Sequence, residues 1–273
     1  MHFYIMQTEQ LNQIFDENKD AWNKRTAVHK DSAFYDVASF KAGKSSLNKI
    51  DLEEVGEVKG KSILHLQCHF GMDTLSWARE GAVVTGMDLS DEAINYAQRL
   101  SEELKIPAEF VCCNLYDLKE HLDKEFDIIF TSYGVIGWLP DLDKWASIIS
   151  HFLKPGGTFH LIEFHPVVWM FDDEFKEIKY AYHNAEIISE QSSGTYTDRE
   201  AAIQYSEHSW NHSLGEVINA LVKHGLRIDH LNEFPYSYYN CFNNVVQGED
   251  GYWRVRGLGN KIPMMYSIKA AKA

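Results

Sequence analysis

The stretch from Lys61 to Asp88 constrains the fold most, because it predicts a strand, a turn, a helix and a second strand in direct succession. The segment SILHLQ is apolar with β propensity, and CHFG forms the turn after it. The helix MDTLSWAREG follows with apolar positions at roughly helical spacing, and Gly81 lies where its C-cap is expected. The apolar segment AVVTGMD ends at Asp88, and Ser90 is placed to cap the next helix. This succession is a βαβ unit.

Two residues of this unit indicate a bound nucleoside. Gly71 opens the first helix, where backbone N–H groups approach a ligand without a Cβ in the way and the helix N-terminus favours an anion. Asp88 ends the second strand, where a carboxylate accepts both hydrogen bonds of a ribose diol. The alternatives are an ordinary loop glycine and a helix-capping aspartate. The second is weakened because Ser90 already supplies the cap.

Four runs carry a resemblance to a known family: ILHLQCHFG, GMDLS, FDIIFTSYG and LKPGGTF. From about Gly60 to Glu163 the chain resembles the Rossmann-like methyltransferases that use S-adenosylmethionine (SAM). That family has the first-loop pattern D-x-G-x-G-x-G, whereas this chain has His65, Gln67 and His69 and keeps only Gly71. Side chains at 67 and 69 leave room for SAM if the backbone there stays in ordinary φ/ψ space.

The resemblance implies an α/β fold with a doubly wound, mostly parallel seven-stranded sheet whose last strand is antiparallel. Four parts are expected: an N-terminal helical lid (1–58), a SAM-binding core (59–164), an inserted antiparallel substrate cap (165–212) and the C-terminal part of the core (213–273). The sequence itself predicts helices in the first and the last of these four parts. Apolar spacing predicts an amphipathic helix over Glu9 to Arg25, and SLGE is a capping box that opens a helix at Ser213.

The family's cofactor positions are carried over residue by residue. The loop after the fourth strand is expected to face the reacting methyl group, and Asn114 is expected to bond the adenine ring with Leu115 as an apolar face. For Asn114 the alternative is a turn built on Asn and Asp chemistry. The residues expected to bind SAM are Gln67, Cys68, His69, Gly71, Asp88, Leu89, Asn114, Leu115, Ser132 and Tyr133.

The acceptor is expected to lie between the lid, the loop after the fourth strand and the cap. The predicted cap strands are Ala185 to Ser189 and Ala202 to His212, and alternation along the second places His208, Trp210 and His212 on one face. The alternatives are that Trp210 only packs the cap onto the body and that the lid aromatics only pack the first helix. The residues expected to contact the acceptor are Tyr35, Trp138, Trp210 and His212, and His29 is a further candidate for the lid.

The resemblance implies methyl transfer by in-line displacement, in which the protein positions donor and acceptor and excludes water. A base is needed only if the acceptor arrives protonated. The candidates are His165, Tyr133, His208 and Glu163, each at the strand-tip edge or in the cap.

Composition and local sequence indicate which classes of partner the protein binds. The net charge of −14 and the lack of a basic block disfavour nucleic acid. SYGV stands where the amino-group methyltransferases of nucleic acids carry N/D-P-P-Y, which favours a small-molecule acceptor. The start MHFYIMQTEQ predicts neither a secretory signal nor a membrane anchor, so a cytoplasmic protein is expected, as a monomer or homodimer. No metal site is expected, because His65 and His69 straddle a strand and a turn.

Two other classes of protein remain open on the sequence. A nucleotide-dependent oxidoreductase would share the βαβ unit and Asp88, but it would carry G-x-G-x-x-G where this chain has QCHFG. A non-catalytic or regulatory SAM-binding protein would share the whole core. The aromatic segment 234–253 is expected to form either a pocket wall or a subunit contact.

Overall fold

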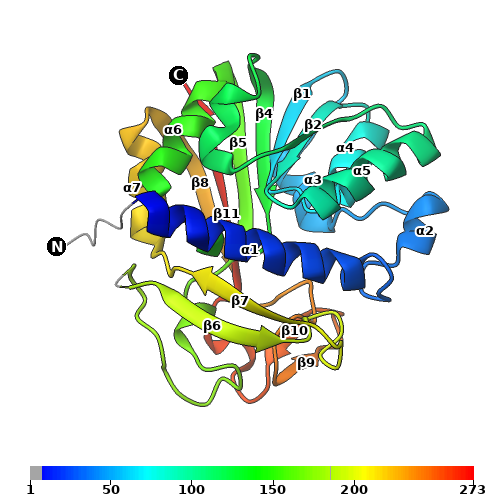
Figure 1. Cartoon of the computed structure of the whole chain (residues 1–273). Coiled ribbons are helices and arrows are strands. Elements are labelled where there is room, and N and C mark those ends of the chain that lie inside the picture. Colours follow the sequence, from blue (N-terminus) through cyan, green and yellow to red (C-terminus); the bar gives the residue numbers. More distant parts are fainter. Residues whose placement is uncertain (1–7, 185) are drawn as a thin grey trace.

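The computed structural model describes residues 8–184 and 186–273. Met1 to Gln7, to which the prediction about a secretory signal refers, lie outside the described residues. So does Ala185, the first residue of the predicted cap strands. Its main element is one seven-stranded sheet with the order β3-β2-β1-β4-β5-β11-β8 (Figure 1). The strands are β1 (Ser62–Leu66), β2 (Val83–Asp88), β3 (Glu109–Cys112), β4 (Phe126–Ser132), β5 (Leu153–Phe164), β8 (Leu226–Phe234) and β11 (Met265–Lys272).

The pairing within this sheet confirms the predicted topology. Strands β3, β2, β1, β4 and β5 are parallel, and β11 runs antiparallel between β5 and β8. Strands β1 and β4 are neighbours at the centre, where the connections turn from one side of the sheet to the other. Ligands bind outside the carboxyl ends of the strands at such a switch point.

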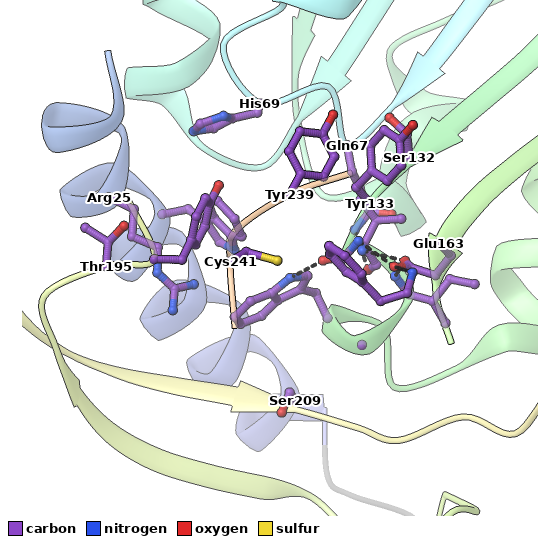
Figure 2. A pocket seen from close by; sticks show the side chains of 18 of the residues that line it. Arg25, Gln67, His69, Ser132, Tyr133, Glu163, Thr195, Ser209, Tyr239 and Cys241 are labelled. Carbon is purple, nitrogen blue, oxygen red and sulfur yellow. Dashed lines mark hydrogen bonds between the residues drawn. The ribbon is translucent and has the colours of Figure 1, made fainter. Parts of the chain in front are cut away.

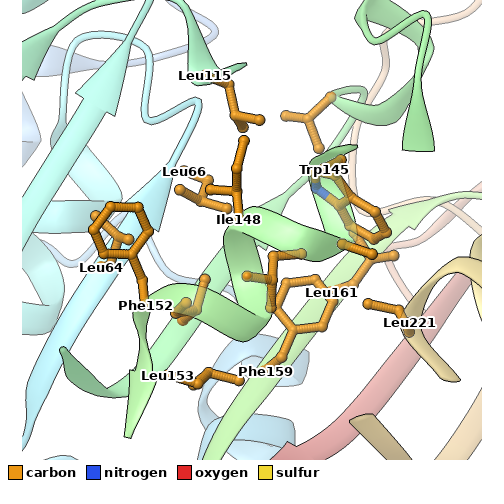
Figure 3. Packing of buried hydrophobic residues seen from close by; sticks show 14 of the residues in the cluster. Leu64, Leu66, Leu115, Trp145, Ile148, Phe152, Leu153, Phe159, Leu161 and Leu221 are labelled. Carbon is orange, nitrogen blue, oxygen red and sulfur yellow. The ribbon is translucent and has the colours of Figure 1, made fainter. Parts of the chain in front are cut away.

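Helices cover both faces of the sheet, which explains why its central strands are continuously apolar. Leu64 and Leu66 of β1 face α6 (Leu142–Phe152) and α7 (Leu214–Lys223), whereas Ile63 faces α3 (Lys49–Val55) and α4 (Met72–Arg79). Helix α5 (Asp91–Leu104) joins α4 and the short α2 (Val37–Lys41) in a third apolar cluster. Figure 3 shows the first cluster, in which Trp145 and Phe152 of α6 and Leu221 of α7 gather on the face of the sheet that carries Phe159 and Leu161 of β5.

Helix α1 (Thr8–His29) lies across the carboxyl edge of the sheet and extends beyond the predicted end at Arg25 (Figure 1). Its Asn23 accepts a hydrogen bond from the Ser90 hydroxyl at 2.6 Å, and its Asn18 accepts one from the backbone N–H of His208 at 2.8 Å. The helix therefore joins the core to the cap. Its buried residues are mostly polar, namely Asn18, Ala21, Arg25, Thr26 and His29. The expected apolar residues are only partly buried, because the inward face borders a cavity.

The cap is an antiparallel hairpin, as predicted, but its strands are β6 (Ile188–Ser193) and β7 (Gln204–Ser209). The second strand ends before Trp210 and His212. The aromatic segment holds a further small hairpin, β9 (Val245–Gln247) and β10 (Trp253–Val255). The structure also has short 3₁₀ helices, namely η1 (Leu115–Glu120), η2 (Ile136–Trp138), η3 (Val168–Met170) and η4 (Gly259–Lys261). Within the part of the chain that the structure describes, no helix is long and apolar enough to cross a membrane.

Candidate active site

A cavity of about 1120 Å³ lies at the carboxyl ends of β1, β2 and β4, under α1 and the cap (Figure 2). All the residues expected to bind SAM and all those expected to contact the acceptor line it. In the view of Figure 2, Arg25 and Thr195 lie at one side, and Tyr133 and Glu163 lie at the other. The core, the lid, the cap and the aromatic segment thus enclose one space.

The loop after β1 has left-handed backbone at all three glycine positions of the family pattern, although only the third is a glycine in this chain. Gln67 has φ 53°, His69 has φ 51° and Gly71 has φ 79°. The condition that residues 67 and 69 stay in ordinary φ/ψ space is therefore not met. Left-handed backbone costs an L-residue about 1–2 kcal/mol. The Gln67 amide donates to the Val135 carbonyl at 2.9 Å, and the Cys68 N–H donates to the Met87 carbonyl at 2.8 Å, so contacts of the loop with both neighbouring strand ends hold this conformation.

His65 occupies the position where the family pattern has an acidic residue. Its Nδ1 lies 2.8 Å from the Thr74 hydroxyl on α4, and the side chain is buried. Burial lowers the pKa of His65 to about 3, so the imidazole is neutral at physiological pH. His65 therefore fixes β1 to the helix that follows it without placing a charge beneath the loop.

Asp88, which is expected to hold a ribose, ends β2 and lines the cavity. Its Oδ2 accepts a hydrogen bond from the His69 N–H at 2.8 Å, and its Oδ1 accepts one from the Ser90 N–H at 2.9 Å. Burial raises the pKa of Asp88, while these N–H groups oppose the rise. Each carboxylate oxygen has about two acceptor sites, so one on each oxygen is left for a ligand. That arrangement matches the two hydroxyls of a ribose.

Asn114 has the turn role that was the alternative considered for it. Its Oδ1 accepts a hydrogen bond from the Tyr116 N–H at 3.0 Å and caps η1, whereas its Nδ2 has no hydrogen-bond partner among the described residues. Gln67 also carries a buried Oε1 without a partner in the described chain. The Asn114 amide can donate a hydrogen bond to a ligand, and the Gln67 Oε1 can accept one. A ligand that both accepts and donates hydrogen bonds fits these two groups, and an adenosine with an amino-acid tail is such a ligand.

Gly71 allows a direct test of the packing behind this loop. A Cβ at Gly71 would meet Phe110 Cε1 at 2.8 Å and Ala97 Cβ at 2.9 Å, at φ +79°. We expect Gly71→Ala to lower the free energy of unfolding by about 2–5 kcal/mol, from left-handed backbone and overpacking together. Gly60→Ala is the matched control, because Gly60 has φ +76° with open space around the added methyl, and it should cost about 1–2 kcal/mol. Urea denaturation measures both, and equal losses would contradict the packing described here.

Glu163 positions the loop after β4. Its side chain is 3% exposed, and its carboxylate accepts hydrogen bonds from the backbone N–H groups of Gly134, Val135, Ile136 and Phe164. All of its acceptor sites are thereby used. Burial raises the pKa of Glu163, and the four N–H groups counter that rise. Glu163 therefore positions this loop and has no acceptor site left with which to take a proton from a substrate.

The two other candidate bases in the cap region do not line the cavity. His165 is buried, with Nε2 at 2.9 Å from Glu233 Oε1 and Nδ1 accepting from the Val167 N–H. His208 lies between Ser189 and Glu17, with Nε2 at 2.7 Å from Glu17 Oε2.

The predicted common face of His208, Trp210 and His212 is wrong in the structure. The cavity side of β7 carries Tyr205, Glu207 and Ser209, and the strand ends before Trp210. The Trp210 N–H donates to the Gly137 carbonyl, and His212 Nε2 lies 2.7 Å from the Leu139 carbonyl oxygen. Trp210 and His212 thus line the cavity and also join the cap to the loop after β4.

The lid closes one side of the cavity through hydroxyl and imidazole contacts. The Tyr35 and Tyr196 hydroxyls lie 2.5 Å apart, and His29 Nε2 lies 2.6 Å from the Thr195 hydroxyl. The His69 ring packs against His29 at a centroid distance of 5.2 Å. Burial lowers the pKa of His29 to about 2 and that of His69 to about 3, so this contact between lid and loop is uncharged.

Arg25 is a cavity residue that the sequence did not reveal. It is 8% exposed, its Nε donates to the Tyr205 hydroxyl at 3.0 Å, and its Nη2 donates to Glu207 Oε2 at 2.5 Å. The guanidinium also lies 5.0 Å from the Trp22 ring centroid and 5.2 Å from that of Trp138. The sequence feature that could have revealed it is the spacing of Ala21, Arg25 and His29, which places all three residues on one face of a helix.

Comparison with known proteins identifies the domain. Residues 63–157 match the family model of a methyltransferase domain. An uncharacterized methyltransferase of Synechocystis is 30% identical over 131 residues, which are 47% of this chain and 59% of that protein. A ubiquinone biosynthesis O-methyltransferase of Chromobacterium violaceum is 30% identical over 106 residues, 39% of this chain and 45% of that protein. The chain thus spans about half the length of the curated relatives it matches.

Solved structures agree on the fold. A SAM-dependent methyltransferase of Clostridium acetobutylicum aligns with a TM-score of 0.57 at 15% identity, covering 93% of this chain and 99% of the other. One of Mesorhizobium loti aligns with a TM-score of 0.54 at 19% identity, covering 85% and 100%. The fold is that of the Rossmann-like, SAM-dependent methyltransferases. Residues 63–157 match a methyltransferase domain, and the solved structures show that the whole chain has the fold of such enzymes.

Proposed function

We propose that the protein transfers a methyl group from SAM to a small-molecule acceptor by in-line displacement. The observation that supports this most is the placement of Asp88 and the glycine-like first loop at one end of a cavity whose other end is closed by the lid and the cap. The cavity accommodates two ligands in one enclosed space, as group transfer between them requires.

In this proposal Asp88 holds the ribose hydroxyls, and Asn114 and Leu115 contact the adenine. Gln67, Cys68, His69, Gly71 and Leu89 surround the rest of the donor, while Ser132 and Tyr133 lie near its methyl group. SAM supplies a methyl group already activated by a sulfonium. The residues of this chain have to orient donor and acceptor and keep water out.

The acceptor is placed between the lid and the cap. Tyr35, Trp138, Trp210 and His212 line that region, together with further aromatic rings of the cap and the aromatic segment. The Phe164, Trp169 and Phe242 rings pack with centroid distances of 4.9–5.9 Å. Such walls favour an acceptor with a planar or apolar body. Similarity to an O-methyltransferase of ubiquinone biosynthesis supports a small molecule, and the net charge of −14 disfavours nucleic acid.

Thermal melting with separate ligands tests the donor. S-adenosylhomocysteine (SAH) at a hundred times its dissociation constant should add about 2.7 kcal/mol of stability. For a chain of this size that raises Tm by about 5–10 °C. NAD at the same concentration should leave Tm unchanged. Stabilisation by NAD without SAH would overturn the proposal in favour of an oxidoreductase.

A second measurement separates an enzyme from a SAM-binding protein without catalysis. SAM labelled in its methyl group is incubated with the protein and a panel of small hydroxylated and amino compounds. Transfer of label to an acceptor supports catalysis. Tight SAH binding with no transfer to any acceptor of the panel favours the non-catalytic alternative.

A further inference from the structure

Two phenol hydroxyls line the cavity beside the end of β4, and a buried carboxylate lies behind one of them. The Tyr133 hydroxyl donates to Asp51 Oδ1 at 2.6 Å, and Asn48 Nδ2 donates to the Tyr133 oxygen at 3.2 Å. The same Asn48 Nδ2 donates to the Tyr239 oxygen at 2.6 Å. Tyr133 and Tyr239 both line the cavity, whereas Asp51 does not. The contacts therefore lead from the cavity through Tyr133 to Asp51.

Asp51 is 0% exposed at the start of α3, where its Oδ2 accepts the Asn48 N–H at 2.7 Å. None of the described lysines or arginines forms an ion pair with it. The titratable groups around it are Asp73 of α4, Tyr133 of the loop after β4, and Tyr238 and Tyr239 of the aromatic segment. Burial first, and Asp73 second, raise the pKa of Asp51 to about 8. A carboxylate in this setting takes up a proton readily near neutral pH.

The hydrogen-bond inventory of Tyr133 leaves one site open towards the cavity. A phenol oxygen donates one hydrogen bond and accepts two. Tyr133 donates to Asp51 and accepts from Asn48, so one acceptor site remains. A hydroxyl in the cavity can donate its hydrogen to that site.

We propose that the acceptor is a hydroxyl compound and that Tyr133 takes its proton while passing its own hydroxyl proton to Asp51, a step that rests on the function proposed above. The acceptor oxygen forms a bond to the methyl carbon, and the carbon–sulfur bond of the sulfonium donor breaks with its electron pair left on sulfur. The acceptor proton moves to the Tyr133 oxygen, and the Tyr133 proton moves to Asp51 Oδ1. The step ends with a neutral thioether, a neutral phenol and a neutral carboxylic acid. Tyr133 is then a catalytic residue, and Asp51 acts through it.

Infrared titration tests this contact in the whole protein without an acceptor. The carbonyl stretch of a protonated carboxyl group should disappear as pH rises through about 8, and Asp51→Asn should remove that component. Tyr133→Phe should move its midpoint upward, because the lost hydrogen bond favours the ionised carboxylate. Tyr236→Phe is the control, since Tyr236 is a phenol of the aromatic segment that does not line the cavity, and it should leave the midpoint in place. A midpoint that does not respond to Tyr133→Phe would overturn the proposal.

Activity gives a second readout, with simple phenols as probe acceptors and labelled SAM as donor. Turnover should rise with pH through about 8, because the reactive form has Asp51 ionised. Tyr133→Phe should lower kcat by about 10²–10⁴-fold, and Asp51→Asn should abolish the rise with pH. Wild-type turnover in Tyr133→Phe would refute the proton transfer. Calorimetry with SAH is read separately: absent SAH binding refutes the proposed function, whereas intact binding with an unresponsive infrared midpoint refutes only the proton transfer.

Discussion

Asp88→Ala is expected to weaken SAH binding by about 10²-fold or more. The carboxylate offers one open acceptor site on each oxygen, and a hydrogen bond to a charged group contributes about 1.5–3 kcal/mol. Two such bonds to a ribose diol amount to at least about 3 kcal/mol, and each 1.4 kcal/mol is a factor of ten in the dissociation constant. Isothermal titration calorimetry measures the change.

Two further variants show which property of Asp88 matters. Asp88→Asn keeps the size of the side chain but replaces one accepting oxygen by a donor, so it should also weaken binding. Asp143→Ala removes a carboxylate that is half exposed on α6 and paired with Lys223, and it should bind SAH as the wild type does. If the affinity of Asp88→Ala for SAH equals that of the wild type, Asp88 does not hold the ribose.

Glu163→Gln is expected to lower the free energy of unfolding by about 2–5 kcal/mol. The carboxylate accepts four backbone N–H groups in a buried site, and an amide places an NH₂ donor against two of them. Each buried group left unsatisfied costs about 1–3 kcal/mol. Because the loop after β4 carries Tyr133 and Trp138, the variant should also bind SAH more weakly than the wild type does.

Differential scanning calorimetry should show this loss as a fall in Tm of about 5–15 °C. Glu125→Gln is the control, because Glu125 is half exposed and lies 3.8 Å from Lys272, and its effect should stay within about 0.5 kcal/mol. A loss in Glu163→Gln as small as that of Glu125→Gln would show that the loop does not depend on the Glu163 carboxylate.

The features predicted correctly from the sequence are those fixed by neighbouring residues. The βαβ unit follows from apolar spacing and from Gly81, and the cap of α7 follows from Ser213 and Glu216 three positions on, which the structure shows as a reciprocal capping box. The antiparallel last strand was expected from the resemblance, and β11 confirms it. For the βαβ unit and the helix cap, the pattern lies within one or two elements.

The features that were missed depend on contacts between distant segments. Asp51 and Tyr133 are 82 positions apart, and Arg25 and Glu207 are 182 apart, so no local pattern joins them. The buried polar face of α1 was missed for a related reason, since a helix that lines a cavity does not need an apolar stripe. In the first loop, the left-handed backbone at Gln67 and His69 is held by tertiary hydrogen bonds, whereas sequence patterns expect glycine there.

A crystal structure of the protein with SAH tests the placement of the donor most directly. We predict that the ribose hydroxyls lie within hydrogen-bonding distance of both Asp88 oxygens, with the adenine against Leu115 and the sulfur facing Tyr133. SAH bound elsewhere, or side chains filling the space in front of Asp88, would contradict this placement and the proposed function with it.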